Sequence, residues 1–190
     1  IYLEDLEDRV KKIKELIESS NSSIIFTNTR ETCEALANFL KGSYPDLKLE
    51  SHHSSLEKDV RIDVEKKLKE GKIKSVIATS SLQLGIDIGT INLVIQYQSP
   101  RQVSQLLQRV GRASHYITNT SKGIIICRDF DDIMESYVIV RKALKGEIED
   151  FFIFKKPLDV LLHQIVGMLI EYKRLEIKKL FEFLKKLSIY

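Results

Sequence analysis

Two arginines three residues apart form the strongest chemical signal in the sequence. They are Arg109 and Arg112, in the segment QRVGRASH at residues 108–115. Arginine suits a phosphate group because its charge is permanent and its planar guanidinium donates to two oxygens at once. An arginine inserted from a second domain can stabilise charge that develops on a transferred phosphoryl group. By spacing alone, a solvated basic helix end with a glycine cap explains the segment equally well.

A second polar segment, ATSSLQLGIDIG at residues 78–89, directly follows an apolar strand pattern. Its hydroxyls and free backbone N–H groups could hold nucleic-acid phosphates, and Asp87 could accept a hydrogen bond from a ribose hydroxyl. The simpler alternative is a polar turn in which Asp87 bonds its own backbone. Taken alone, this segment favours the simple turn.

Two further segments have the composition of anion sites. Residues 26–30, FTNTR, end a strand pattern and begin a helical one, where Thr29 can cap the helix beside Arg30. Residues 52–55, HHSS, precede another helical pattern and could contact a nucleic-acid backbone. Adjacent histidines do not match zinc-ligand spacing, so no metal site is expected. A capped helix and a serine N-cap explain these two segments as single features.

The elements that must position these segments alternate along the chain. Short apolar, β-branched runs predict strands, and apolar residues at helical spacing predict helices. The strands are expected at residues 23–27, 47–50, 75–79, 93–96 and 123–127, and the helices at 3–17, 30–40, 56–68 (opened by Ser54 or Ser55), 103–110 and 129–144. Such alternation predicts an α/β fold with a parallel sheet sandwiched by helices. Ligands bind beyond the carboxyl ends of such strands, where Thr27 and Thr79 would lie.

The composition of the sequence changes after Gly146. An acidic patch and FFIFKKP at residues 151–157 indicate a linker and a domain edge. We therefore expect one domain over residues 1–150. Residues 151–190 contain two helical patterns, at 160–172 and 177–187, and are too short to form a domain alone. They are expected to pack on the first domain or to begin a second.

Composition narrows the class of protein. The 30 basic and 27 acidic side chains give a net charge of +3, so nucleic-acid affinity would come from local arrangement. Cys33 and Cys127 match no metal spacing and are expected to be reduced core thiols. No apolar run approaches the roughly 20 residues that span a bilayer, so a cytoplasmic protein without membrane contact is expected. The 190 residues contain neither a Gly-Lys-Ser/Thr phosphate loop nor an acidic magnesium motif, which argues against an independent ATPase.

Taken together, and in their order along the chain, the four segments resemble the motifs of the second, C-terminal RecA-like domain of superfamily 2 helicases. Residues 26–30 resemble motif IV, His53 and Ser54 the His-Gly pair that follows it, residues 78–87 motif V and residues 108–115 motif VI. The residues of these motifs most closely resemble those of the Lhr (large helicase-related) group. KPLDVL at residues 156–161 also resembles the start of that group's winged-helix domain, so residues 151–190 would be a linker and its truncated first helices.

The resemblance implies a role for each matched position. Arg112 would be the arginine finger, supported by Gln108 and Arg109 as the remaining catalytic residues. His115 stands where many relatives carry a third arginine. The ATP-binding residues would be Gly85, Asp87, Arg112 and His115. The nucleic-acid-binding residues would be Thr27, Asn28, Arg30, His53, Ser54, Thr79 and Ser80.

The resemblance also implies the partners. ATP would bind in a cleft between this domain and a missing N-terminal RecA-like domain, which would supply the Mg²⁺ ligands. The expected function is that of a fragment of an ATP-dependent helicase or translocase, inactive alone, acting on DNA rather than RNA and serving DNA repair. Two alternatives stay open at this point: a duplex translocase without strand separation, and a non-catalytic module that binds nucleic acid or protein.

Overall fold

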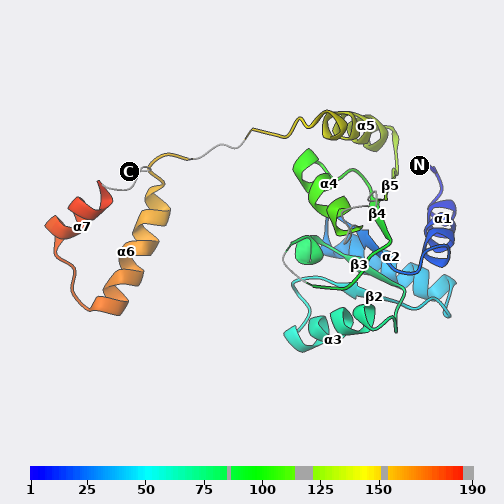
Figure 1. Cartoon of the computed structure of the whole chain (residues 1–190), viewed down its shortest axis with the longest axis horizontal. Coiled ribbons are helices and arrows are strands. Elements are labelled where there is room, and N and C mark those ends of the chain that lie inside the picture. Colours follow the sequence, from blue (N-terminus) through cyan, green and yellow to red (C-terminus); the bar gives the residue numbers. More distant parts are fainter. Residues whose placement is uncertain (85–86, 114–121, 151–153, 186–190) are drawn as a thin grey trace. The chain divides into compact units, whose positions relative to one another are not determined.

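The computed structural model describes residues 1–84, 87–113, 122–150 and 154–185 (Figure 1). These residues divide into two compact units, Ile1–Glu149 and Asp150–Tyr190. The first unit carries all four chemical segments.

The first unit is built on a sheet of five parallel strands in the order β2-β3-β1-β4-β5 (Figure 1). The prediction of a parallel α/β sheet is therefore confirmed. The central strand β1 pairs with both β3 and β4, so Phe26 lies opposite Ala78 on one side and Gln96 on the other. This register brings the carboxyl ends of the three strands to one edge. The strands are β1 (Ser23–Phe26), β2 (Leu49–His52), β3 (Ser75–Ala78), β4 (Leu93–Tyr97) and β5 (Gly123–Ile126).

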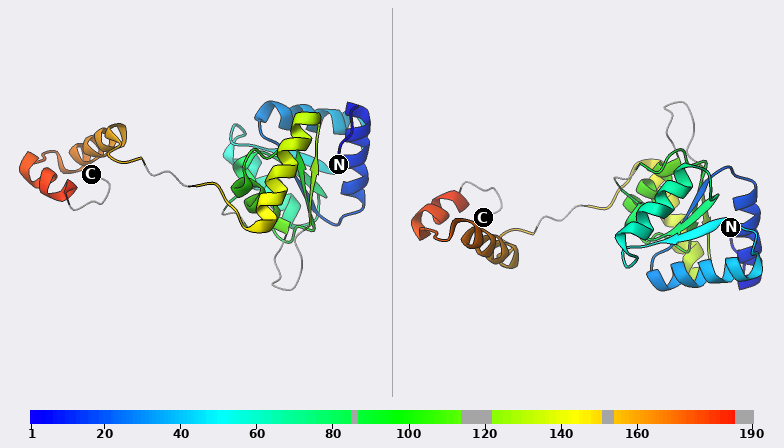
Figure 2. Two further views of the ribbon diagram at one scale, coloured as in Figure 1. Left: turned by 90° about the horizontal axis from the view of Figure 1, so that it is seen from above. Right: turned by 90° about the horizontal axis from the view of Figure 1, so that it is seen from below.

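Helices cover both faces of the sheet, as Figure 2 shows. Side chains alternate between faces along each strand. Ile25 packs against α1 and α2, whereas Ile24 and Phe26 pack in the core that α3 completes. Helices α4 and α5 pack on Ile125 of β5. The helices are α1 (Leu6–Glu18), α2 (Arg30–Ser43), α3 (Lys58–Lys69), α4 (Val103–Val110) and α5 (Phe130–Lys145), with one-turn 3-10 helices η1 (Ser80–Leu82) and η2 (Gly111–Ala113).

Two helix starts test the expected capping. Thr29 caps α2 as predicted, because its hydroxyl accepts the N–H of Thr32 at 3.1 Å. The expected start of α3 at Leu56, opened by Ser54 or Ser55, is wrong. The carbonyl of His53 accepts the N–H of Leu56 at 3.1 Å and closes a turn over both serines, and α3 begins at Lys58.

Cys33 and Cys127 are free and buried, as predicted. Burial raises the pKa of the Cys33 thiol to about 11. Within the described ranges, no helix combines the length and apolar character that a membrane crossing requires.

The edge of the sheet at β5 is extended by the first residues of the chain. Tyr2 forms a parallel bridge with Cys127, whose N–H donates to the carbonyl of Ile1 at 2.8 Å. Arg9 of α1 is buried and donates to the carbonyl of Leu3 at 2.8 Å. The segment before α1 is therefore tied both to β5 and to its own helix.

The second unit contains α6 (Leu158–Tyr172) and α7 (Ile177–Leu184). Neither helix has a buried side chain among its described residues. Two short helices cannot bury enough apolar surface to form a core of their own.

Helix α4 is fixed at both ends. At its start, the carboxylate of Glu149 accepts the N–H groups of Val103 and Ser104. At its end, Val110 packs against Gly123 of β5, where a Cβ would lie 2.7 Å from Val110 Cγ2. The position of α4, and of the arginine segment that it carries, therefore depends on these two contacts.

We expect Gly123→Ala to lower the free energy of unfolding by about 1–3 kcal/mol, because the added methyl group has no space beside Val110. The double variant Gly123→Ala/Val110→Ala removes the clash. Its loss of unfolding free energy should therefore be smaller than the sum of the losses in the two single variants. Denaturant unfolding of the four proteins measures both effects. A Gly123→Ala variant as stable as the wild type would contradict the tight packing.

Glu149 should make stability depend on pH. The N–H of Val103, followed by other backbone donors, lowers the pKa of Glu149 from 4.5 to about 2. A lowered carboxyl pKa stabilises the fold above pH 4.5, and the contribution is lost as the pH falls from about 4.5 to about 2. The melting temperature of Glu149→Gln should therefore lie below that of the wild type at pH 6, and the two should converge towards pH 2. Glu147→Gln, at an exposed neighbour, is the control expected to show no such convergence.

Candidate functional site

The loops that carry the four segments meet at the carboxyl edge of the sheet. The N–H of Thr27 donates to the carbonyl of Ala78 at 2.8 Å, and that of Thr79 donates to His52 at 3.3 Å. Arg30 Nη1 donates to Ser55 Oγ at 3.2 Å. Three segments far apart in the sequence thus meet at the edge where parallel sheets bind ligands.

Arg109 lies in the interior behind this edge, with 3% of its surface exposed. Its guanidinium donates to four side-chain amide oxygens from four different segments. Nη1 bonds Asn28 at 3.1 Å and Gln96 at 2.7 Å, Nε bonds Gln83 at 3.2 Å, and Nη2 bonds Gln105 at 3.1 Å. We call these four amides the Arg109 cage.

No carboxylate in the described part of the chain forms an ion pair with Arg109. Burial lowers its pKa to about 10, so it stays charged at neutral pH. The ring of Phe26, 5.4 Å from the guanidinium carbon, adds a cation–π contact. Neutral dipoles and one aromatic ring therefore solvate this buried charge.

Arg112 occupies a different environment. It is half-buried in η2, and its Nε donates to the backbone carbonyl of Gln83 at 3.0 Å. The Gln83 side chain also donates through Nε2 to Gln108 Oε1 at 2.5 Å. Gln83 therefore contacts Gln108, Arg109 and Arg112, which were the three residues expected to be catalytic.

The structure separates the expected roles of the two arginines. Arg109, expected to be catalytic, is enclosed by its cage and offers almost no exposed surface to a phosphate group. Gln108 is exposed, and Arg112 lies at the surface edge. Three of the four cage residues, Gln83, Gln96 and Gln105, were missed by the sequence analysis, whereas Asn28 was expected to bind nucleic acid. One signal was available: Gln96 interrupts the otherwise apolar strand pattern of β4.

Motif V presents hydroxyls to solvent. Ser80 is exposed and Thr79 is half-buried. Asp87 is exposed, with Oδ1 accepting the N–H of Gly89 at 3.2 Å and Oδ2 lying 2.6 Å from Lys69 Nζ. The turn that was the simpler alternative for Asp87 is therefore present. Gly85 and His115, expected at the ATP site, lie outside the described residues.

Two residues expected to contact nucleic acid are buried instead. Thr27 is fully buried, and its hydroxyl donates to the carbonyl of Thr29 at 3.2 Å. His53 is 5% exposed, with Nε2 lying 2.6 Å from Glu34 Oε1. Their side chains pack beneath the edge of the sheet. Arg30 and Ser54 are exposed as a contact requires.

Asn28 connects the cage to a strained loop after β4. Its Nδ2 donates to the carbonyl of Ser99 at 2.7 Å. Gln98 and Arg101 have φ values of 67° and 69°, which side chains other than glycine rarely adopt. Buried Asp132 accepts the N–H of Ser99 at 3.2 Å and holds the loop. Backbone strain of this kind gathers at functional sites.

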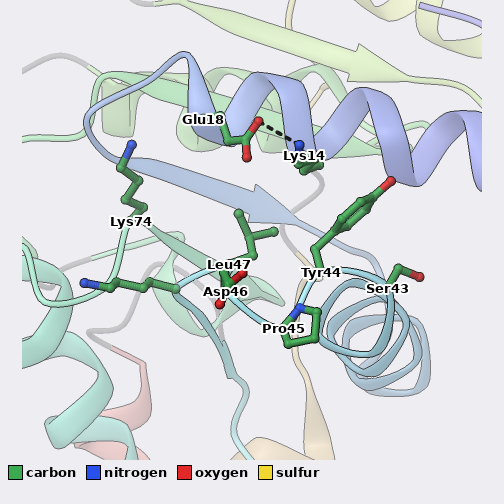
Figure 3. A pocket seen from close by; sticks show the side chains of 9 residues that line it. Lys14, Glu18, Ser43, Tyr44, Pro45, Asp46, Leu47 and Lys74 are labelled. Atoms are coloured by element: carbon green, nitrogen blue, oxygen red, sulfur yellow. Dashed lines mark ion pairs between the residues drawn. The ribbon is translucent and has the colours of Figure 1, made fainter.

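A separate cavity of about 520 Å³ lies among the residues that precede β2 and β3, at the other edge of the sheet (Figure 3). Lys14 and Lys74 line it together with Glu18, Asp46 and the ring of Tyr44. Lys14 and Glu18 form an ion pair at 3.0 Å. The mixed charges indicate no ligand class. Across the described ranges, no group of three or more His, Cys, Asp or Glu side chains could hold a metal ion.

Several known proteins with related sequences are named helicases. Residues 8–116 match the family model of the helicase conserved C-terminal domain. The chain is 44% identical over 178 residues to the ATP-dependent helicase Lhr-Core of Methanocaldococcus jannaschii, covering 94% of this chain and 21% of that protein. Lhr-Core protein 2 of Thermococcus barophilus is 45% identical, with coverage of 85% and 19%. The chain thus spans about a fifth of the length of these relatives.

Solved structures agree. The Mycobacterium smegmatis helicase Lhr, bound to ssDNA and AMP-PNP, superimposes with a TM-score of 0.81 and 38% identity, covering 86% of this chain and 22% of that one. The C-terminal domain of the DEAD-box protein Dbp5 gives a TM-score of 0.63 at 25% identity, with coverage of 78% and 86%.

The fold, the four motif segments at one edge and the matched family model all lead to the same assignment. The chain belongs to the family of helicase conserved C-terminal domains, in a form similar to the Lhr helicases.

Proposed function

We propose that this chain is the second RecA-like half of an ATP-dependent nucleic-acid motor, and that Arg112 is its arginine finger. The observation that carries the proposal is the pair of unlike arginine environments: Arg109 is locked in the interior, while Arg112 stands at the surface edge beside motif V. A guanidinium at a domain surface can reach a triphosphate held by a second domain.

In this proposal, the ligands of ATP and Mg²⁺ are divided between two domains. The described residues offer Arg112 as a donor to phosphate oxygens and Asp87 as an acceptor for a ribose hydroxyl. Mg²⁺ needs carboxylate or hydroxyl ligands beside the phosphates, and we assign these to an N-terminal RecA-like domain. Gly85 and His115 complete the proposed ATP contacts.

The proposed nucleic-acid track runs over the exposed polar groups of the same edge. Ser80 and Thr79 would hold one backbone phosphate, and Arg30 with Ser54 would hold another. Contacts to phosphates carry little sequence preference. DNA is the proposed strand, supported by the ssDNA bound to the similar M. smegmatis Lhr. A role in DNA repair is proposed by analogy with the Lhr group alone.

We assign residues 151–190 to a linker and the first helices of a winged-helix domain. The division of the chain after Glu149 supports this boundary. The exposed apolar side chains of α6, among them Leu162 and Ile170, are consistent with a helix that requires the rest of such a domain.

Replacing Arg112 tests the motor. In the full-length protein, Arg112→Ala should lower nucleic-acid-stimulated ATP hydrolysis by about 10³-fold or more, because the finger acts on the transition state. Arg128→Ala, which removes an exposed arginine paired only with its neighbour Asp129 in the described structure, is the control and should keep the wild-type rate. Equal rates for wild type and Arg112→Ala would instead identify a non-catalytic binding module.

Replacing Thr79 tests the track. Thr79→Ala in the full-length protein should raise the dissociation constant for single-stranded DNA about 2–10-fold, the effect of losing one hydrogen bond. Fluorescence anisotropy at fixed salt measures the change in the dissociation constant. RNA of the same length, added as a competing ligand, tests the proposed preference for DNA. Thr90→Ala, at an exposed threonine before β4, should bind like the wild type. Equal affinities for wild type and Thr79→Ala would remove this residue from the track.

A further inference from the structure

We propose that Gln83 is a positioning residue that couples nucleic-acid binding at Thr79 and Ser80 to the position of the arginine finger Arg112. This inference rests on the proposed function. Gln83 touches neither strand nor nucleotide in the proposal. It acts through the residues on either side of it.

The link from the strand contact to Gln83 is short and stiff. Ser80 begins the one-turn helix η1, and Gln83 directly follows its last residue. The N–H of Gln83 donates to the carbonyl of Ser80 at 3.0 Å. Leu82 is 1% exposed and anchors the turn in the core. A phosphate that pulls on Ser80 therefore shifts Gln83 as part of the same turn.

The link from Gln83 to the arginines uses three separate polar groups. Its backbone carbonyl accepts from Arg112 Nε, its side-chain oxygen accepts from Arg109 Nε, and its side-chain N–H donates to Gln108. An amide side chain supplies a donor and an acceptor together. Gln83 is 7% exposed, so water does not replace these partners easily. Gln83 therefore joins motif V to η2 through its backbone, and through its side chain to α4, which leads directly into η2.

Gln105 provides a matched comparison. It also gives its side-chain oxygen to Arg109, at 3.1 Å, but it lies on α4 itself. Its only other side-chain hydrogen bond in the described structure joins it to Gln102, the residue just before the same helix. Loss of the Gln105 amide weakens the Arg109 cage without touching the connection between η1 and η2.

The test replaces each glutamine by methionine, which keeps the length of the side chain and removes the amide. In the full-length protein, we measure ATP hydrolysis with and without single-stranded DNA, and DNA affinity separately. Gln83→Met should lower the ratio of stimulated to unstimulated rate about tenfold while DNA affinity stays within about twofold of wild type. Gln105→Met should lower the melting temperature comparably but keep the ratio. Equal ratios for the two variants, or a wild-type ratio for Gln83→Met, would overturn the inference.

A second readout separates this inference from the proposed function. Hydrogen exchange of the 190-residue chain requires no catalysis. Gln83→Met should speed exchange of the amides at 111–113, and Gln105→Met should not. Unchanged exchange in Gln83→Met overturns the positioning role whatever the ATPase result. Faster exchange in a protein whose wild type shows no stimulated hydrolysis would uphold Gln83 as the residue that holds η2, and would refute both its coupling role and the proposed motor.

Discussion

The burial of one permanent charge, that of Arg109, is the constraint on which the site depends. A guanidinium removed from water costs several kcal/mol unless hydrogen bonds replace its hydration. Here four amide oxygens and the Phe26 ring replace it, without a carboxylate from the described residues. Each acceptor must therefore stay in place, since the loss of any one leaves a buried donor unpaired.

This requirement connects the sheet to the loops. Gln96 comes from β4, Asn28 from the loop after β1, Gln83 from motif V and Gln105 from α4. Asn28 and Gln83 then continue the connection, to the strained loop at Ser99 and to Arg112. Through Asn28 and Gln83, the polar interior thus helps to fix the relative positions of the surface groups that the proposed function uses. Amides suit this role because each can accept from the arginine and donate elsewhere.

The sequence predicts the fold well because its signals are local. Apolar β-branched runs gave all five strands to within about two residues, and Thr29 caps α2 as its side chain suggests. The predicted start of α3 was wrong because serine forms turns as readily as it caps helices. Here the His53 carbonyl accepts the N–H of Leu56, which closes a turn over Ser54 and Ser55. The site was predictable as a set of loops at one edge. The burial of Thr27, His53 and Arg109 was not, because it depends on side chains that approach from other segments.

The central position of β1 governs the order in which the chain can fold. Its two neighbours, β3 and β4, lie some 50 and 70 residues further along the sequence, and β5 must form before Tyr2 can pair. Contacts so distant in sequence close large loops before they return any stabilisation, which makes folding slow. During synthesis, β1 therefore emerges with both of its edges open, and Tyr2, which precedes it, can pair only after β5 has emerged.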